Sequence, residues 1–263
     1  MGYGGLVPAP DVPKLPERFW TQPGVFGVGR LESRPPLIPF PDADAARAGN
    51  RIDSPWFRSL DGRWRFLLTD RPEAGPASWA DPDHDDRRWK QVDVPGNWTL
   101  QDVGDGPHYT NVVMPIGGEP PEVPDDNPTG LYRRTFRVPR GWAGRRTILH
   151  VGGAVSVVSV WINGAFVGLG KDSRLPSEFD ITPWLRSGRN VVALQVIRWS
   201  DASWLEDQDH GWMAGLPREV VLRSLGRPGL GSVSVTAGLA DPDPSTPVQI
   251  GTVSIDAEVD VDG

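Results

Sequence analysis

The sequence predicts an all-β fold, an antiparallel β-sandwich of jelly-roll type, and three observations favour it. Its 263 residues include 31 glycines and 28 prolines, which interrupt the chain too often for long helices. Short runs rich in β-branched and aromatic residues recur between turn residues. The 12 tryptophans suit a sandwich core, although a tryptophan face can also stack on a sugar ring.

The composition excludes several classes of function. The chain carries 27 basic and 34 acidic side chains, a net charge of −7, so no nucleic acid partner is expected. Because there is no cysteine, disulfides, thiolate metal sites and cysteine nucleophiles are excluded. The sequence shows no secretion signal and no apolar stretch of about 18 residues, so we expect no membrane span and a cytoplasmic location.

The first half of the chain gives few strand signals. Residues 1–47 are proline-rich, with at most a short helix at 42–48, and we expect them to form an arm on a surface. The first convincing strand, residues 63–68, follows an Asp-Gly turn. Residues 70–129 are far longer than an ordinary connection and are therefore either functional or disordered. Four aromatic residues argue against disorder: Trp79, Trp89, Trp98 and Tyr109.

The second half of the chain has a regular strand pattern. Residues 131–138 alternate apolar and polar side chains, apart from Arg134, as a half-buried strand does. Asn163-Gly164 predicts a type I′ hairpin, because both central positions of that turn need a positive φ. Further strands are expected at residues 147–151, 155–162, 165–169, 190–199 and 218–223. Strands of this number and spacing predict the sandwich.

We expect the sandwich to span residues 48–225. After a glycine-rich turn at 226–231 the pattern restarts, with two alternating strands at 232–236 and 252–261. Two strands bury too little surface to fold alone. Residues 226–263 are therefore interpreted as the truncated beginning of an immunoglobulin-like β-sandwich, and the chain as part of a longer polypeptide.

The densest group of polar side chains lies at residues 198–210, after a predicted strand. It contains Asp201, Glu206, Asp207, Asp209 and His210. Such a group can be a solvated loop whose carboxylates cap and pair locally. It can also hold a cation through oxygen ligands, or accept hydrogen bonds from vicinal hydroxyls. A third interpretation makes Asp201 and Glu206 the acid and nucleophile of a glycosidase, which needs two carboxyl groups about 5–10 Å apart.

Two further segments offer polar contacts. Pro128 forces Asn127 into an extended conformation, which holds its amide where it can donate to and accept from a ligand hydroxyl. An ordinary turn before the next strand is the alternative. Residues 172–180 are expected to form a Ser/Asp-rich turn with Arg174 among carboxylates, and most such residues are local caps and ion pairs.

In their order along the chain and in their amino-acid sequence, these segments resemble the N-terminal domain of the large bacterial β-galactosidases of glycoside hydrolase family 2. The resemblance rests on residues 127–130, 171–180, 198–201 and 205–209, with support at 59–66, 95–98, 109–111, 120–124 and 213–215. It covers residues 48–225 in unbroken order. The strings Asp-Ser-Arg-Leu-Pro-Ser-Glu-Phe-Asp and Glu-Asp-Gln-Asp are typical of the galactosidase branch, rather than of the glucuronidases and mannosidases with the same architecture.

The resemblance implies a function for a longer protein. In this family a galactose-binding-like jelly roll packs beside a catalytic (β/α)₈ barrel, which hydrolyses terminal non-reducing β-D-galactose residues, for example in lactose, with retention. The residue that matches Asn127 hydrogen-bonds the substrate, and the residue that matches Asp201 contacts galactose and ligates sodium. The catalytic glutamates and the magnesium ligands lie in the barrel, beyond residue 263. Asp201 and Glu206 are therefore not the catalytic pair.

No catalytic residue is accordingly expected in this segment, which alone should be inactive, and the full-length enzyme is expected to be a homo-oligomer. Gly211 and Pro217 depart from the family's usual residues and can weaken loop packing near the site. Three functions remain open: a segment of a retaining β-galactosidase, a stand-alone carbohydrate-binding jelly roll without catalysis, and a structural sandwich for subunit contacts. The half-built second domain argues against the second, and the polar loops at Asn127 and Asp201 argue against the third.

Overall fold

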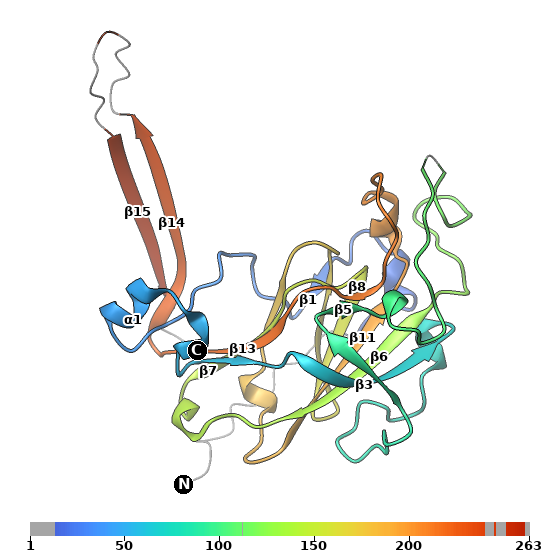
Figure 1. Cartoon of the computed structure of the whole chain (residues 1–263), viewed down its shortest axis with the longest axis horizontal. Coiled ribbons are helices and arrows are strands. Elements are labelled where there is room, and N and C mark those ends of the chain that lie inside the picture. The colour runs from blue at the N-terminus through green and yellow to red at the C-terminus, as the bar shows by residue number, and fades with distance from the viewer. Residues whose placement is uncertain (1–13, 112, 240–244, 246–250, 261–263) are drawn as a thin grey trace.

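The computed structural model describes residues 14–111, 113–239, 245 and 251–260, and most of its regular structure is β-strand (Figure 1). The predicted all-β fold with antiparallel sheets is confirmed. Among the described residues, the helices are all short, and none is long and apolar enough to cross a membrane. They are α1 (Ala43–Ala48) and the 3₁₀ helices η1 (Phe19–Thr21), η2 (Arg51–Asp53), η3 (Pro72–Ala74), η4 (Trp98–Leu100), η5 (Arg140–Trp142), η6 (Thr182–Trp184) and η7 (Asp201–Trp204).

Two antiparallel sheets form the sandwich. The larger sheet has the order β1-β9-β8-β11-β6-β3-β4. Its strands are β1 (Gly27–Val28), β3 (Gly62–Thr69), β4 (Lys90–Val94), β6 (Thr129–Phe136), β8 (Val157–Ile162), β9 (Ala165–Lys171) and β11 (Asn190–Ile197). The smaller sheet has the order β10-β7-β13-β2. Its strands are β2 (Phe57–Ser59), β7 (Arg146–Val151), β10 (Ser177–Asp180) and β13 (Val220–Leu225). The short strands β5 (Gly96–Asn97) and β12 (Gly215–Leu216) pair with each other.

The core lies between the inner faces of the two sheets. In β3, the buried Trp64 and Phe66 alternate with Arg63 and Arg65, which remain at least partly exposed. Phe66 packs edge-on against Tyr132 of β6, with ring centroids 4.9 Å apart. Half of the 12 tryptophans are buried, and all 12 lie in the described residues, so packing is the main role of this residue type. The buried ones are Trp20, Trp64, Trp98, Trp142, Trp199 and Trp212.

The structure confirms two local predictions and corrects one. Asn163 and Gly164 join β8 to β9 with φ angles of 53° and 86°, as a type I′ turn requires. The described part of the long stretch before β6 is packed rather than disordered, since Trp98 is fully buried within it. The prediction of a turn at residues 172–180 was wrong for its second half, because residues 177–180 form β10, which pairs with β7. The polar residues of this segment are typical of a turn, but Glu178 is buried and contacts charged partners from distant segments.

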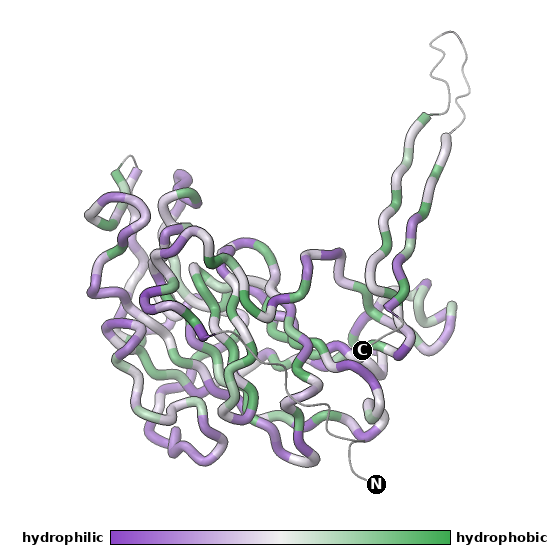
Figure 2. Tube along the Cα trace, turned by 180° about the vertical axis from the view of Figure 1, so that it is seen from behind, coloured by the Kyte–Doolittle hydropathy of each residue, from purple (hydrophilic) through white to green (hydrophobic). Residues whose placement is uncertain are grey.

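β14 (Gly229–Leu239) and β15 (Gly251–Asp260) form a long hairpin that projects away from the sandwich (Figures 1 and 2). Among the described strands they pair only with each other. Apolar and polar residues alternate along both strands, so that Val235 lies opposite Ile255 and Ser234 opposite Asp256. The hairpin therefore has one apolar face, which is the pattern of a sheet whose one face covers a core. The interpretation as the start of an immunoglobulin-like domain stays a prediction.

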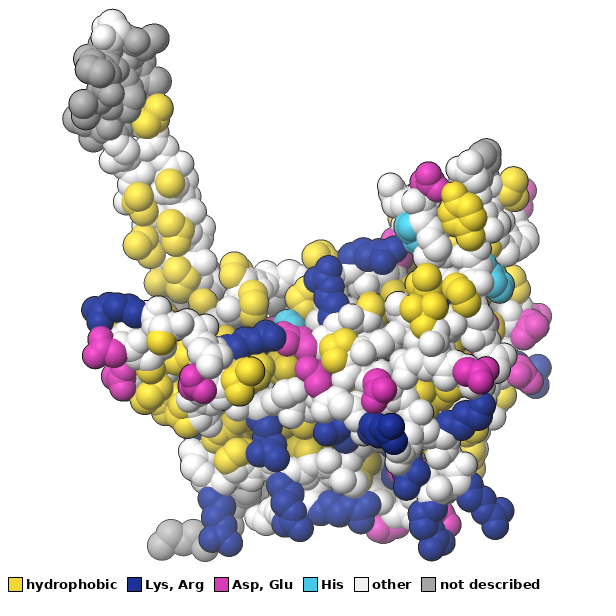
Figure 3. All heavy atoms as spheres, viewed as in Figure 1, with side chains coloured by type: hydrophobic (Ala, Val, Ile, Leu, Met, Phe, Trp, Pro, Cys, Tyr) yellow, Lys and Arg dark blue, Asp and Glu magenta, His cyan; other side chains and the backbone are white. Residues whose placement is uncertain are grey.

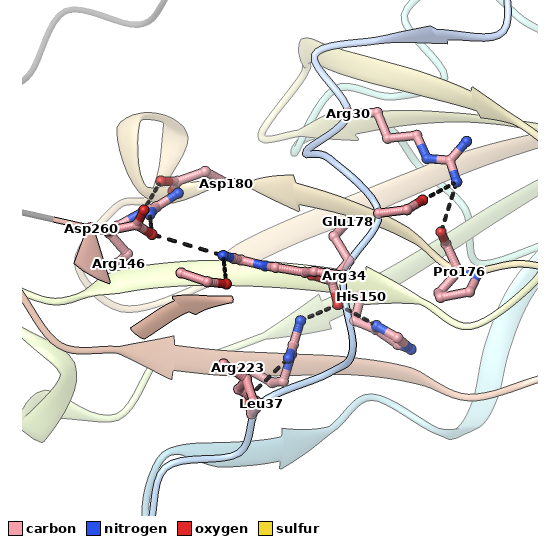
Figure 4. Close-up of polar contacts among 12 residues, drawn as sticks. Arg30, Arg34, Leu37, Arg146, His150, Pro176, Glu178, Asp180, Arg223 and Asp260 are labelled. Carbon is pink, nitrogen blue, oxygen red and sulfur yellow. Dashed lines mark hydrogen bonds and ion pairs between the residues drawn. The ribbon is translucent and has the colours of Figure 1, made fainter. Parts of the chain in front are cut away.

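Ionic contacts hold the base of this hairpin against the sandwich (Figure 4). Arg146 of β7 donates from Nε to Asp180 and from Nη1 to Asp260 of the hairpin, both at 2.8 Å. Arg34 of the N-terminal segment lies 3.8 Å from Asp260 and donates to the carbonyl of Gly231. The arm, the smaller sheet and the hairpin are thus joined at one place.

Glu178 forms the centre of the neighbouring ionic cluster. Its carboxylate is 2.7 Å from His150 Nδ1, contacts the Arg223 guanidinium and lies 3.8 Å from Arg34. Burial by itself would raise the pKa of Glu178, but the hydrogen bond from His150 and the charge of Arg223 together lower that pKa below its usual value. The ionised carboxylate therefore stabilises the folded chain.

The lowered pKa of Glu178 predicts a pH dependence of stability. A carboxylate with a depressed pKa in the folded state contributes stability above its unfolded pKa of about 4.3, and this contribution is lost as the pH falls through the folded pKa. Glu178→Gln should therefore lower the free energy of unfolding by about 3–5 kcal/mol near neutral pH, since it leaves the Arg223 charge buried and unpaired. The deficit should shrink below the folded pKa. Urea unfolding at a series of pH values measures this, with the exposed Glu119→Gln as control, and a deficit that is independent of pH would contradict it.

Gly130 of β6 gives a packing prediction. A Cβ at this position would lie 2.7 Å from Phe66 and 2.9 Å from Trp98 ring carbons, closer than packed atoms allow. Gly130→Ala should lower the free energy of unfolding by about 1–3 kcal/mol, because the aromatic core must shift. Gly141→Ala is the matched control, because no atom lies within 4 Å of its Cβ position, and it should change stability by less than about 0.5 kcal/mol. Equal effects in urea unfolding would refute the packing argument.

Candidate functional site

The two predicted binding residues, Asn127 and Asp201, lie in loops at the same end of two central strands of the larger sheet. β6 and β11 are antiparallel neighbours, and Thr129 at the start of β6 pairs with Ile197 at the end of β11. The loop before β6 and the loop after β11 are therefore adjacent. The structure brings together two segments that are about 70 residues apart in the sequence.

Asn127 is almost completely buried, and its amide bonds to the backbone of Trp199. Its Nδ2 donates to the Trp199 carbonyl at 2.9 Å, and its Oδ1 accepts from the Trp199 N–H at 3.0 Å. This pair of bonds continues the β6–β11 ladder beyond the strands and fixes the path into the Asp201 loop. A carboxamide has a second N–H and a further lone pair, so Asn127 keeps one donor and one acceptor for a ligand.

Asn127 also lines an open cleft of about 290 Å³. The other lining residues are Arg18, Trp20, Arg71, Pro72, Glu73, Pro124 and Asp125. Arg18 donates to Asp125 across the cleft at 2.5 Å, and this contact raises the pKa of Arg18. The cleft therefore combines an aromatic side chain, a carboxamide and charges of both signs, a set that suits a hydroxylated ligand.

Asp201, the first residue of η7, neutralises a buried ammonium group. Its Oδ1 lies 2.6 Å from Nζ of Lys171, and the two side chains are only 9% and 3% exposed. Lys171 also donates to the carbonyls of Phe19 and Gln22, both at 3.1 Å. All three ammonium hydrogens thus have acceptors. Lys171 ties the N-terminal arm, the end of β9 and the Asp201 loop together.

The donor set of this chain fits a sodium site in part. Asp201 keeps Oδ2 as a hard oxygen ligand, whereas its Oδ1 and two nearby carbonyls are bonded to the Lys171 ammonium. The described residues hold no group of three or more acidic or histidine side chains that could bind a metal. Sodium binding at Asp201 therefore stays a prediction, for which Oδ2 is the carboxylate oxygen that is not bonded to Lys171.

The other polar residues of the 198–210 loop contact neighbouring loops. Glu206 accepts from the Ser173 N–H at 2.9 Å and from its hydroxyl at 2.5 Å, so it fixes the loop after β9. Arg174 donates to His210 Nε2 at 3.0 Å, which leaves the His210 proton on Nδ1, 2.9 Å from the Gly211 carbonyl. Asp201 and Glu206 thus have separate partners, and Glu206 acts in loop packing.

The two departures from the family pattern lie beside a buried aromatic group. Trp212, next to Gly211, is 4% exposed and packs against Trp199, with ring centroids 5.3 Å apart. Pro217 lines a small cavity of about 60 Å³ near this group. Burial and the neighbouring Arg198 charge lower the pKa of His108, whose backbone bridges to Trp212. The aromatic packing is therefore maintained one residue after Gly211.

Sequence reasoning missed the roles of Lys171 and of the N-terminal segment. The only local signal was a lysine at the end of an apolar strand, which is ordinarily solvent-exposed. Its two carbonyl partners lie about 150 residues earlier in the chain, so no local pattern indicates them. Trp20, which is buried and lines the Asn127 cleft, was missed for the same reason.

The Lys171–Asp201 pair predicts a strong energetic coupling. Lys171→Met or Asp201→Asn alone should lower the free energy of unfolding by about 3–5 kcal/mol, because each leaves a buried charge without its partner. The double variant should lose less than the sum of the two, with a coupling of about 1–3 kcal/mol. Urea unfolding of the four proteins completes the cycle. Additive losses would mean that the two charges do not interact.

Solved structures of other proteins share this fold. A β-glucuronidase from Bifidobacterium dentium, in complex with coumarin-3-O-glucuronide, superposes with a TM-score of 0.52 at 22% identity, over 71% of this chain and 33% of that one. β-Glucuronidase 2 from Bacteroides uniformis gives 0.57 at 22% identity, over 79% and 22%. A β-glycosidase from Bacteroides vulgatus gives 0.52 at 20% identity, over 78% and 24%.

These identities establish a common fold only, and the chain spans a third or less of each protein. A family match is more informative. Residues 57–226, which include every strand of the sandwich except β1 and also the Asn127 and Asp201 loops, match the family described as glycosyl hydrolases family 2, sugar binding domain. Because the match covers more than half of the sequence, the chain belongs to glycosyl hydrolase family 2 and contains its sugar-binding domain.

Proposed function

We propose that this chain is the N-terminal part of a β-galactosidase that hydrolyses terminal non-reducing β-D-galactose residues, as in lactose, with retention. The catalytic glutamates and magnesium ligands of such an enzyme would lie in a (β/α)₈ barrel beyond residue 263. The present segment then contributes substrate contacts and no proton transfer, because glycoside hydrolysis with retention needs a pair of carboxyl groups at a set spacing. A homo-oligomer of the full-length protein is part of the same proposal.

The observation that carries the proposal is the convergence of the Asn127 and Asp201 loops. Both segments belong to the motifs that resemble the galactosidase branch, and both lie at the same end of the paired strands β6 and β11. Their side chains are held by bonds to Trp199 and Lys171, so neither needs to be ordered when a sugar binds. Such preorganisation favours affinity, because less conformational entropy is lost on binding.

In this proposal Asn127 and Asp201 use the atoms that the fold leaves available. The second N–H of Asn127 would donate to a galactose hydroxyl at the rim of its cleft. Oδ2 of Asp201 would accept from a hydroxyl and serve as one ligand of a sodium ion, whose other ligands would come from outside the described residues. A carboxylate oxygen can bind both a hard cation and a hydroxyl donor.

A β-glucuronidase is the second candidate. The solved structures that share the fold include proteins named β-glucuronidases, and Arg18 and Arg71 line the cleft beside Asn127, where a guanidinium could pair with a uronate carboxylate. Glu73 and Asp125 line the same cleft and oppose a negative ligand. A stand-alone carbohydrate-binding module without catalysis is the remaining alternative.

The decisive experiment uses the full-length protein that contains this chain. We expect nitrophenyl β-galactoside to be hydrolysed with a higher kcat/KM than the matching β-glucuronide, and the 1–263 segment alone to be inactive. Measured per folded enzyme, because this variant also loses the Lys171 ion pair, Asp201→Asn should reduce kcat/KM for the galactoside about 10- to 100-fold, as expected for the loss of one charged hydrogen bond of about 1.5–3 kcal/mol. It should also flatten the response to sodium when potassium keeps the ionic strength constant.

Two variants serve as controls. Asp207→Asn makes the same charge change at an exposed position of the same loop and should behave like the wild type. Asn127→Ala should impair galactoside hydrolysis and leave the sodium response unchanged. A wild-type response of Asp201→Asn would contradict the proposed sugar and sodium contacts, and a preference for the glucuronide would favour the second candidate.

A further inference from the structure

A second cleft, of about 420 Å³, lies on the outer face of the larger sheet, over β3, β4 and β6. Its lining includes Thr135, which pairs with Val191 near the start of β11. The Asn127 cleft lies beyond Thr129, at the other end of β6. Thr135 lies six positions after Thr129 in β6, or roughly 20 Å along the strand. The two clefts are therefore separate sites.

Arginine dominates the lining of this second cleft. It contains five arginines, one carboxylate and two neutral polar side chains: Arg63, Arg65, Arg133, Arg134, Arg189, Asp86, Gln91 and Thr135. We call it the arginine cleft. Basic side chains gather along the lower side of the molecule in Figure 3, although the whole chain has a net charge of −7. A positive cleft on an acidic protein attracts anions locally.

The single carboxylate of the arginine cleft cannot neutralise it. Asp86 lies 2.9 Å from the buried Arg133, which also donates to the Trp79 carbonyl. The charge of Asp86 is therefore paired with Arg133. The same carboxylate is 3.8 Å from Arg65, too far for a hydrogen bond. Arg189 is exposed and makes no hydrogen bond or ion pair with any described residue. Arg65 and Arg189 therefore keep guanidinium donors for a ligand.

Arg63 is also weakly compensated. It lies 3.9 Å from Asp93 and 3.4 Å from the Gln91 carboxamide oxygen, and its side chain is 75% exposed. Exposed ion pairs of this length contribute little. The arginine cleft thus carries at least three guanidinium groups whose charges are not closely paired.

The geometry points to a hydroxylated anion as the ligand, and we propose that the arginine cleft binds a sugar ring that carries a phosphate, sulfate or carboxylate group. Guanidinium groups bind such oxyanions through paired hydrogen bonds. The hydroxyl of Thr135 and the carboxamide of Gln91 can both donate to and accept from sugar hydroxyls. The volume lies within the range of roughly 300–1,000 Å³ that is usual for small-molecule sites. This inference goes beyond the proposed function and is independent of it.

Calorimetric titration of the protein with four probes tests this site: glucose-6-phosphate, glucuronate, inorganic phosphate and glucose. We expect binding of the two charged sugars, weaker binding of inorganic phosphate and none of glucose at the same concentration. Affinity for the charged sugars should fall as NaCl is raised, because exposed charges are screened. Arg65→Gln and Arg189→Gln should each weaken the binding of glucose-6-phosphate about tenfold, as expected for the loss of a charged hydrogen bond.

Arg140→Gln is the matched control, since it removes an exposed arginine that does not line the arginine cleft. Its affinity for glucose-6-phosphate should equal that of the wild type, and unchanged melting temperatures would show that all three variants fold. If no anion binds, or if Arg65→Gln and Arg189→Gln bind as the wild type does, the proposal is wrong. Equal affinities for inorganic phosphate and glucose-6-phosphate would contradict the part assigned to Thr135 and Gln91.

Discussion

The antiparallel pairing of β6 with β11 determines where the polar loops of this chain lie. The two strands pair along the whole of β6, from Thr129–Ile197 to Phe136–Asn190, in the middle of the larger sheet. A slip of one residue would turn Tyr132 and Leu194 from the core to the outer face, so the hydrophobic pattern fixes the register. With the register fixed, the Asn127 and Asp201 loops must meet at one end of these two strands, whereas the arginine cleft lies over the outer face of β3, β4 and β6.

Buried ion pairs hold in place the segments that are not part of the β6–β11 pairing. Lys171 joins the N-terminal arm to the Asp201 loop, and Glu178 joins the smaller sheet to Arg34 of the arm. An unpaired charge inside a protein costs more than most hydrogen bonds contribute, so each cluster is stable only when all of its members are present. The two clusters therefore join the described part of the arm, residues 14–47, to the sandwich, although its sequence has little strand pattern.

Sequence patterns predicted the parts of the fold that depend on neighbouring residues. Alternation indicated β6, a run of apolar residues indicated β11, and Asn163-Gly164 indicated the hairpin between β8 and β9, because turn geometry is a local property. β10 was not predicted, because Glu178 is stabilised there by Arg223, 45 residues later in the chain.

The candidate site, too, could be predicted only where the information is local in the sequence. Its location could be inferred from the segments that contain Asn127 and Asp201. The contacts of these two residues could not be inferred, because the Lys171 ammonium and the Trp199 backbone become their partners only when the strands have paired. The bonds from Lys171 to the arm carbonyls could not be inferred either, since no local pattern connects segments so far apart.

The hairpin of β14 and β15 has a consequence for the handling of this protein. Its apolar side chains remain 49–67% exposed at Leu230, Val235, Leu239, Val253, Ile255 and Val259. Each of the two strands also has an outer edge that no other described strand covers. A two-stranded ribbon with open edges and one apolar face is a template on which further strands can assemble. Any preparation that leaves this ribbon uncovered is prone to form intermolecular β-sheet, and a chain that ends before β14 removes the template without cutting into either sheet of the sandwich.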